Sequence, residues 1–173
     1  MAASTTKVRR FGDPFLRKKT EEVTVFNSEL KDFIDHMIDT LYEENGLGLA
    51  APQVGDLRKI IIVDLSFGEE VENTLTLINP EVLSQEGECV MEEGCLSIPG
   101  IYEDLTRPEK VRIQYREPDG AVREIDADGL VARIIQHEMD HLDGILFVDR
   151  LSTVKKLLLA KALREIAEEN GNS

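Results

Sequence analysis

Hydrophobic residues recur at helical spacing in three stretches of the chain. The first, between Asn27 and Gly46, predicts an amphipathic helix, because its apolar positions fall three and four residues apart and its flanking residues suit helix ends. The second lies between Asp128 and Gly144 and has the same spacing and the same kind of boundaries. A third helix is expected from Ser152 towards the end of the chain, with a leucine-rich face available for packing.

Other hydrophobic runs have the period of β-strands. Residues 59–65 predict a strand, and the unbroken apolar run at positions 60–63 within it is typical of a strand buried on both faces. Residues 74–79 predict a second strand, which we expect to end where an Asn-Pro pair follows. Residues 111–115 and 122–125 alternate with period two around a Pro-Asp-Gly turn, so they predict a hairpin.

These elements predict one α+β domain over residues 1–173. Mostly antiparallel strands are expected to pack around the central histidine-bearing helix, with a further helix at the C-terminal end. The chain shows no repeat or low-complexity linker, and its hydrophobic content of 42% is ordinary for a folded domain.

The charge balance narrows the classes of partner. Lys and Arg number 20 against 34 Asp and Glu, which leaves a formal charge of −14 and argues against sequence-specific nucleic-acid binding. No apolar run has the length of a membrane span, and the first residues lack the pattern of a secretory signal. Two cysteines, Cys89 and Cys95, are too few for a disulfide framework. We therefore expect a cytoplasmic protein in which a thiolate ligand is an option.

The second predicted helix carries two histidines four residues apart. Helical spacing places His137 and His141 one turn apart on the same face, with Glu138 directly beside them. The three groups continue an apolar stripe, so they are expected to point inward. Buried without partners, each would cost about 1–3 kcal/mol or more, whereas a metal ion with a bound water satisfies all three. The pattern favours a catalytic metal site over a solvated face or core histidines bonded to carbonyls.

A catalytic metal of this kind usually takes a third protein ligand. One peptidase group supplies a third histidine six residues after the second, but Phe147 stands there. Another supplies a glutamate from a later helix, for which Glu165, Glu168 and Glu169 are the candidates. A third option is Cys95, whose neighbouring glycine permits close approach. The residues alone leave three readings open: a metallopeptidase with a glutamate ligand, an enzyme with a cysteine ligand, and a metal-binding module without activity.

Three segments of the chain together resemble the signature motifs of the peptide deformylases. They are Gly46–Gln53 (GLGLAAPQ), Glu93–Ser97 (EGCLS) and Gln136–His141 (QHEMDH), in this order. The resemblance extends to the Asp13–Arg17 turn and to the Arg107–Val111 strand entry, so it covers nearly the whole chain. It implies a metal-dependent hydrolase that removes the formyl group from the N-terminal formylmethionine of newly synthesised proteins and releases formate.

The resemblance also implies roles for single residues. The metal ligands would be Cys95, His137 and His141, and a metal-bound water would attack the formyl carbon with Glu138 as general acid and base. Gln53 and the Leu96 backbone N–H are similar to the oxyanion donors of the family. The family commonly uses ferrous iron, and the same ligand types also bind zinc.

For the substrate, the resemblance implies an extended peptide added as a strand. Leu47, Gly48 and Gly94 match the backbone positions that pair with it, and an apolar pocket that includes Ile134 would take the methionine side chain. The partners would be N-formylmethionyl nascent polypeptides. Some relatives also dock transiently on the ribosome through a basic terminal helix, but the last helix of this chain has nearly balanced charge. The roles of Glu93, Gln136 and Cys89 stay open.

Overall fold

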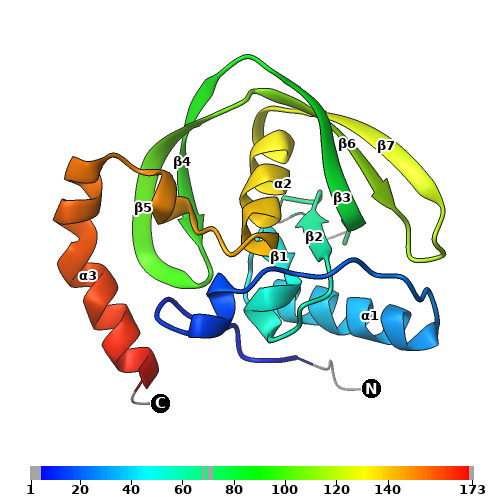
Figure 1. The fold of residues 1–173 in the computed structure, drawn as a ribbon, viewed down its shortest axis with the longest axis horizontal. Helices are drawn as coiled ribbons and strands as arrows, with labels where there is room; N and C mark the ends of the chain where they lie inside the picture. The colour runs from blue at the N-terminus through cyan, green and yellow to red at the C-terminus, as the bar shows by residue number, and fades with distance from the viewer. Residues whose placement is uncertain (1–4, 68, 70–71, 172–173) are drawn as a thin grey trace.

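The computed structural model describes residues 5–67, 69 and 72–171, which fold into helices and antiparallel strands (Figure 1). The elements in chain order are η1 (Pro14–Arg17), α1 (Ser28–Glu43), β1 (Gly48–Ala50), η2 (Ala51–Val54), β2 (Ile60–Asp64), β3 (Thr74–Glu86), β4 (Cys89–Cys95), β5 (Ile98–Arg107), β6 (Lys110–Arg116), β7 (Val122–Asp128), α2 (Gly129–Leu142), η3 (Phe147–Arg150) and α3 (Thr153–Gly171). The prefix η marks short 3-10 helices.

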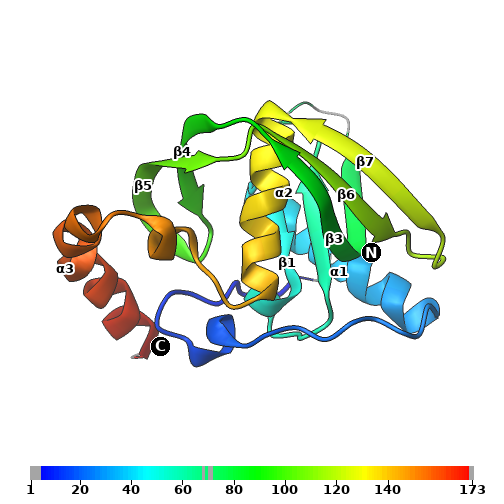
Figure 2. The same cartoon turned by 45° about the horizontal axis from the view of Figure 1, so that its top comes forward.

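The strands form two antiparallel sheets on either side of α2. The larger sheet has the order β1-β2-β3-β6-β7, so β1 lies at its edge, and β4 and β5 form a separate two-stranded sheet. Both views show α2 running between the two sheets, with β3 and β6 leading over it into β4 and β5 (Figures 1 and 2). The prediction of an α+β fold with antiparallel strands around a central helix, followed by a C-terminal helix, is confirmed.

Helix α2 buries both its apolar residues and its histidines. Ala132 and Ile135 are fully buried against β2 and β6, and His137 and His141 lie on the same inward side. Asp128 takes the N-cap position, and Gly144 adopts the positive φ of +74° that glycine tolerates after a helix end. The helix is therefore fixed by packing on both sides, and this fixes the direction of its imidazoles.

The other two helices cover different parts of the molecule. α1 packs its buried face, which includes Leu30 and Met37, against β1 and β2. α3 packs beside β5 through Leu159, Leu163 and Ile166, which contact the small cluster around Ile98. None of the helices in the described residues combines the length and the apolar character that crossing a bilayer needs.

The prediction that the second strand ends at Asn79-Pro80 is wrong. β3 continues to Glu86. It pairs with β2 as far as Ile78 and with β6 from Ile78 onward. The register shifts here, because Asn79 has a φ of +51° and Pro80 has no N–H to donate to a ladder. The pair therefore marks the irregularity at which the strand changes partners.

Strands β4 and β5 were not predicted, and neither was the short strand β1. Acidic and glycine residues interrupt the apolar pattern of β4 and β5, and the exposed face of β5 carries Tyr102 and Asp104. Their pairing depends instead on a hydrophobic contact with distant residues, because Ile98 and Leu105 pack on Phe147 and Leu151 of the η3 segment. A contact between segments so far apart in the chain leaves no local period in the sequence.

Asn79 should be important for stability because its side chain joins β3 to the N-terminal segment. Its Oδ1 accepts a hydrogen bond from the Val23 N–H at 2.8 Å, and its Nδ2 donates to the Val23 carbonyl at 2.9 Å. We expect Asn79→Ala to lower the free energy of unfolding by about 2–4 kcal/mol, since it loses both bonds and keeps a strained φ. Asn79→Gly should cost less because glycine relieves that strain. Denaturant unfolding of both variants tests this, and an equal or larger loss for glycine would contradict it.

Candidate metal centre

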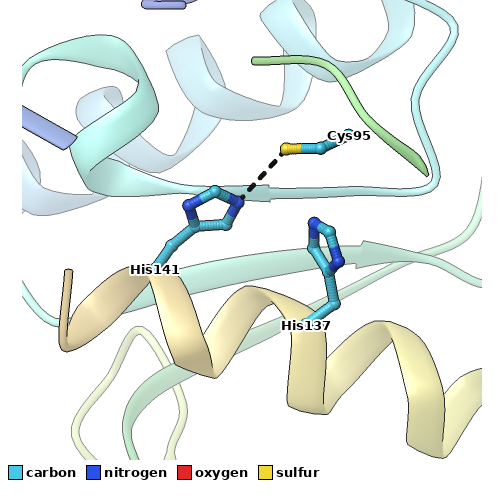
Figure 3. Close-up of side chains that lie close together, drawn as sticks. All are labelled: Cys95, His137 and His141. Atoms are coloured by element: carbon cyan, nitrogen blue, oxygen red, sulfur yellow. Dashed lines mark hydrogen bonds between the residues drawn. The ribbon is translucent and has the colours of Figure 1, made fainter. Parts of the chain in front are cut away.

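Three side chains with metal-ligating atoms meet between β4 and α2. Cys95 lies at the end of β4, and His137 and His141 project from α2 towards it (Figure 3). The ligand atoms of the three residues all lie within 4.8 Å of one another, and Cys95 Sγ is 3.4 Å from His141 Nε2. In the part of the chain that the structure describes, this is the one group of three such residues placed to hold a metal ion.

The environment of each imidazole fits a bound cation. His137 Nδ1 lies 2.9 Å from Glu93 Oε1, which leaves its Nε2 facing the centre. Burial opposes a positive charge on His137, but hydrogen bonding with Cys95 and Glu93 outweighs it and raises the pKa of His137 well above the usual value. The surroundings of this imidazole therefore favour a positive charge. Burial lowers the pKa of His141 well below the usual value, which keeps it in the neutral form that binds metals. The donor set therefore fits a thiolate and imidazole metal site.

Glu138 stands beside the three candidate ligands. Its Oε1 is 3.9 Å from His137 Nε2, and its Oε2 is buried without any hydrogen-bond partner. Burial raises the pKa of its carboxyl group to about 7, well above that of a carboxylate in water. A carboxyl group of this kind can exchange protons near neutral pH.

Arginine residues neutralise the buried carboxylate that orients His137. Glu93 is 5% exposed, and Arg107 and Arg133 bind it at 2.5 Å each. Burial alone would raise the pKa of Glu93, but the hydrogen bonds from His137 and Arg107 outweigh it and lower the pKa to about 2. Glu93 therefore stays ionised and holds the Nδ1–H of His137.

Arg107 connects Glu93 on β4 to another carboxylate, which lies on α2. This second carboxylate is Asp140, and Arg107 binds it at 2.9 Å. Arg150, at the end of η3, donates hydrogen bonds to Asp140 from two nitrogens, at 2.6 and 2.7 Å. Asp140 directly precedes His141. The segment that carries both histidines is thus tied to β5 and to η3 by charge-assisted hydrogen bonds.

Gln53 reaches the centre from the side of the larger sheet. Its Oε1 accepts the Ala50 N–H at 2.9 Å, which fixes the amide, and its Nε2 donates to Ser97 Oγ at 3.0 Å and lies 3.7 Å from Cys95 Sγ. Leu96 lies in the two-residue turn between β4 and β5, and its N–H makes no hydrogen bond to any described residue. Two N–H donors therefore lie next to the candidate ligands.

A cleft of about 510 Å³ opens beside the centre. Two edge strands border it, since Leu47 and Gly48 come from β1 and its approach and Gly94 comes from β4. Gly94 lies at the irregularity in the β4–β5 pairing, directly before Cys95. Ile134 lines the cleft one turn before Glu138. The four residues expected to contact substrate thus share one cavity with Cys95, His137 and Glu138.

The structure separates the alternatives for the third ligand. Cys95 meets the histidines, whereas Glu165, Glu168 and Glu169 lie on α3, which packs on the far side of β5 (Figure 1). The residues that the sequence reasoning missed are the arginines and Asp140. The sequence did contain one sign of this network. Arg133 is a charged residue four positions before His137, on the inward face of α2, and a buried charge there needs an acidic partner.

The remaining motif residues have local roles. Gln136 donates from Nε2 to the carbonyl of Pro108 at 3.0 Å, and so it links α2 to the turn between β5 and β6. Cys89 is partly buried at the start of β4, and its carbonyl accepts a hydrogen bond from Arg133. Neither side chain belongs to the metal-ligating group.

Comparison with known proteins gives a consistent result. The family model described as polypeptide deformylase matches residues 5–157. The chain is 46% identical to the peptide deformylase of Thermodesulfovibrio yellowstonii, over 91% of this chain and 96% of that protein. It is 48% identical to that of Wolinella succinogenes, over 88% of this chain and 91% of the relative.

Solved structures agree in fold as well as in sequence. The peptide deformylase from Plasmodium falciparum superposes with a TM-score of 0.92 at 37% identity, covering 96% of this chain and 98% of that one. The enzyme from Thermus thermophilus gives a TM-score of 0.88 at 36% identity, with 95% and 99% coverage.

The contact between Glu93 and His137 predicts an effect on metal affinity. Glu93→Gln removes the charge that holds the imidazole in position, so we expect divalent metal to bind about 10- to 100-fold more weakly. Glu92→Gln, one residue earlier and exposed on β4, is the matched control and should leave the affinity unchanged. Competition with a chromogenic chelator measures both. Equal affinities for the two variants would show that Glu93 does not orient the ligand.

Proposed function

Because the chain belongs to the peptide deformylase family, we propose that the residues gathered between β4 and α2 carry out the reaction of that family in a single catalytic domain. The chain is a metal-dependent hydrolase that removes the formyl group from N-terminal formylmethionine and releases formate. The observation that carries the assignment of roles is the group formed by Cys95, His137 and His141, with the buried Glu138 beside it.

The three grouped residues are the proposed ligands of one divalent ion. Such an ion polarises a carbonyl oxygen and lowers the pKa of a bound water towards about 7. We propose ferrous iron in the cell, which the family commonly uses, and zinc as an ion that the same thiolate and imidazole set accepts. Glu93 keeps His137 in the tautomer that presents Nε2 to the ion.

Glu138 acts as the general base and then as the general acid. It takes a proton from the water that attacks the formyl carbon, and it returns a proton to the amine nitrogen when the C–N bond breaks. The products are formate and a free N-terminus. A pKa raised to about 7 by burial supports both directions of transfer near neutral pH.

Gln53 and Leu96 stabilise the negative charge that develops on the formyl oxygen. The Gln53 amide is held in place through its Oε1, and the Leu96 N–H has no partner among the described residues. Donors fixed before the reaction do not have to reorganise during it, and loss of one typically lowers the rate about 10²- to 10³-fold.

The substrate peptide lies in the cleft as an added strand between β1 and β4. Both are edge strands of their sheets, so the backbone groups at Leu47, Gly48 and Gly94 can pair with an extended peptide. The methionine side chain enters the pocket lined by Ile134. Glycine at position 48 is needed because a Cβ there would lie 2.8 Å from both Glu138 and Ile134.

The setting of the reaction follows from its substrate. We propose that the enzyme acts in the cytoplasm on N-formylmethionyl nascent polypeptides, a proposal supported by its similarity to bacterial peptide deformylases. α3 keeps Val154, Leu157 and Leu158 exposed beside two lysines, and this face would be available for a transient contact with the ribosome. Direct sequence-specific binding of nucleic acid is no part of the proposal, given the formal charge of −14.

Substitution of Glu138 tests the proposed roles directly. For formate release from formyl-Met-Ala-Ser by iron-loaded protein prepared without oxygen, we expect Glu138→Gln to lower kcat about 10²- to 10⁴-fold, because the amide cannot transfer the proton. The variant should keep its metal, whereas Cys95→Ser should lose both metal and activity. An active Glu138→Gln variant would exclude Glu138 as the base. Activity in Cys95→Ser would point back to a glutamate ligand and a peptidase.

Gly48→Ala should disturb the same carboxylate by steric contact. The added methyl group meets Glu138 Cγ and Oε1, so we expect kcat to fall about 10- to 100-fold through misplacement of the base. Gly46→Ala is the matched control from the same loop, because its methyl group meets only the flexible ends of Leu96 and Leu41. Steady-state kinetics compares kcat of the two variants, and thermal unfolding checks that both are folded. Equal losses would mean that the loop, and not the contact with Glu138, is responsible.

A further inference from the structure

A guanidinium group forms part of the wall of the substrate cleft. Arg133 lies on α2 one turn before His137 and lines the same cleft as Leu130 and Ile134. It is 4% exposed, so its charge is almost wholly removed from water. The ion pair with Glu93 accounts for the buried charge of Arg133. It does not account for all of the guanidinium N–H groups that border a cleft expected to enclose the hydrocarbon part of a methionine.

The hydrogen bonds of Arg133 account for three of its five N–H groups. Nη1 donates to Glu93 Oε2 at 2.5 Å and to the Leu105 carbonyl at 2.9 Å, and Nη2 donates to the Cys89 carbonyl at 2.6 Å. Two N–H groups remain, the second one on Nη2 and the one on Nε, and Nε makes no hydrogen bond to any described residue. A guanidinium keeps all five donors at every pH in which the protein is folded, so this N–H is always available.

The free Nε–H retains access to the cleft. Among the described residues, only Glu138 Oε2 and His141 Nδ1 are side-chain polar atoms that are fully covered and lack a partner. Arg133 Nε also lacks a partner but is not fully covered. Because Arg133 as a whole is buried and borders the cleft, the cleft is the space that this N–H reaches.

We propose that Arg133 is a specificity-determining residue whose Nε–H donates a hydrogen bond to the thioether sulfur of the substrate methionine. The inference rests on the proposed function, which places the methionine side chain in this pocket. Thioether sulfur is a weak acceptor, and a charged donor strengthens such a bond. The three other hydrogen bonds hold the guanidinium still, so little freedom is lost when the sulfur arrives.

The donor gives the pocket a preference that shape alone cannot supply. Norleucine has the length of methionine with a methylene group in place of the sulfur. An entirely apolar pocket would accept norleucine at least as well, because the methylene gains more from leaving water. A pocket with a buried N–H in its wall leaves that donor unpaired when norleucine binds, and the analogue is therefore disfavoured.

The test compares formate release from formyl-Met-Ala-Ser and formyl-norleucine-Ala-Ser by the same iron-loaded protein. We expect the ratio of kcat/KM, methionine over norleucine, to be about 3 to 10 for the wild type, as for one modest hydrogen bond. Arg133→Leu and Arg133→Lys should bring this ratio close to one. Lysine can still pair with Glu93, but its single ammonium group cannot also supply a donor at the Nε position.

The ratio separates the role in specificity from damage to the fold. Weaker metal binding or a shifted Glu93 lowers the efficiency with both peptides and leaves their ratio unchanged. Leu130→Ile is the control, because Leu130 lines the same cleft without a donor, and its ratio should remain that of the wild type.

If Arg133→Leu does not fold, the methionine-to-norleucine ratio of Arg133→Lys tests the inference by itself. A wild-type ratio of one or below, or a wild-type ratio retained in Arg133→Lys, overturns the inference. Absence of formate release from both peptides by folded, metal-loaded wild type would instead overturn the proposed function.

Discussion

The rest of the site depends on keeping one carboxylate ionised inside the protein. Glu93 is buried next to α2, and an unpaired charge there would be far too costly, so Arg107 and Arg133 must reach it from β5 and α2. Removing one partner of such a buried pair commonly costs about 3–5 kcal/mol, which makes these contacts hard to change singly. The paired carboxylate can then hold His137 in one orientation. The same requirement fixes β4 relative to α2, because Glu93 lies on β4 and two residues before Cys95.

The division into two sheets gives this network its place. β3 leaves the larger sheet and leads into β4, and β5 returns to β6, so the small sheet stands across α2 from the larger one (Figure 2). The edges of β1 and β4 remain unpaired along the cleft between them. An edge strand is usually a liability, since it can pair with any extended chain. Here the two edges face the cleft that holds the reactive groups, where pairing with an extended chain is useful.

The sequence alone predicted the helices better than the strands. The periods of α1 and α2 were visible because each helix buries one continuous stripe, and His137, Glu138 and His141 follow directly from that stripe. Cys95 required the combination of motifs, since nothing local distinguishes a ligand from a small buried thiol. β4 and β5 escaped prediction because they are held by contacts with η3 and α3. The role of Arg133 could not be predicted either, because it depends on which atoms of Glu93, Leu105 and Cys89 the folded chain brings within reach.

The three proposed metal ligands are not all close together in the order of synthesis. Cys95 leaves the ribosome 46 residues before His141, so the site cannot assemble until most of the chain has emerged. An ion that binds the closed arrangement and not the open one ties the small sheet to the central helix and stabilises the folded state by mass action. The entropic cost of closing a loop grows only slowly with its length, so one ion can hold together segments that are far apart in the sequence. The proposed metal would therefore make the stability of the folded chain depend on the supply of metal during and after synthesis.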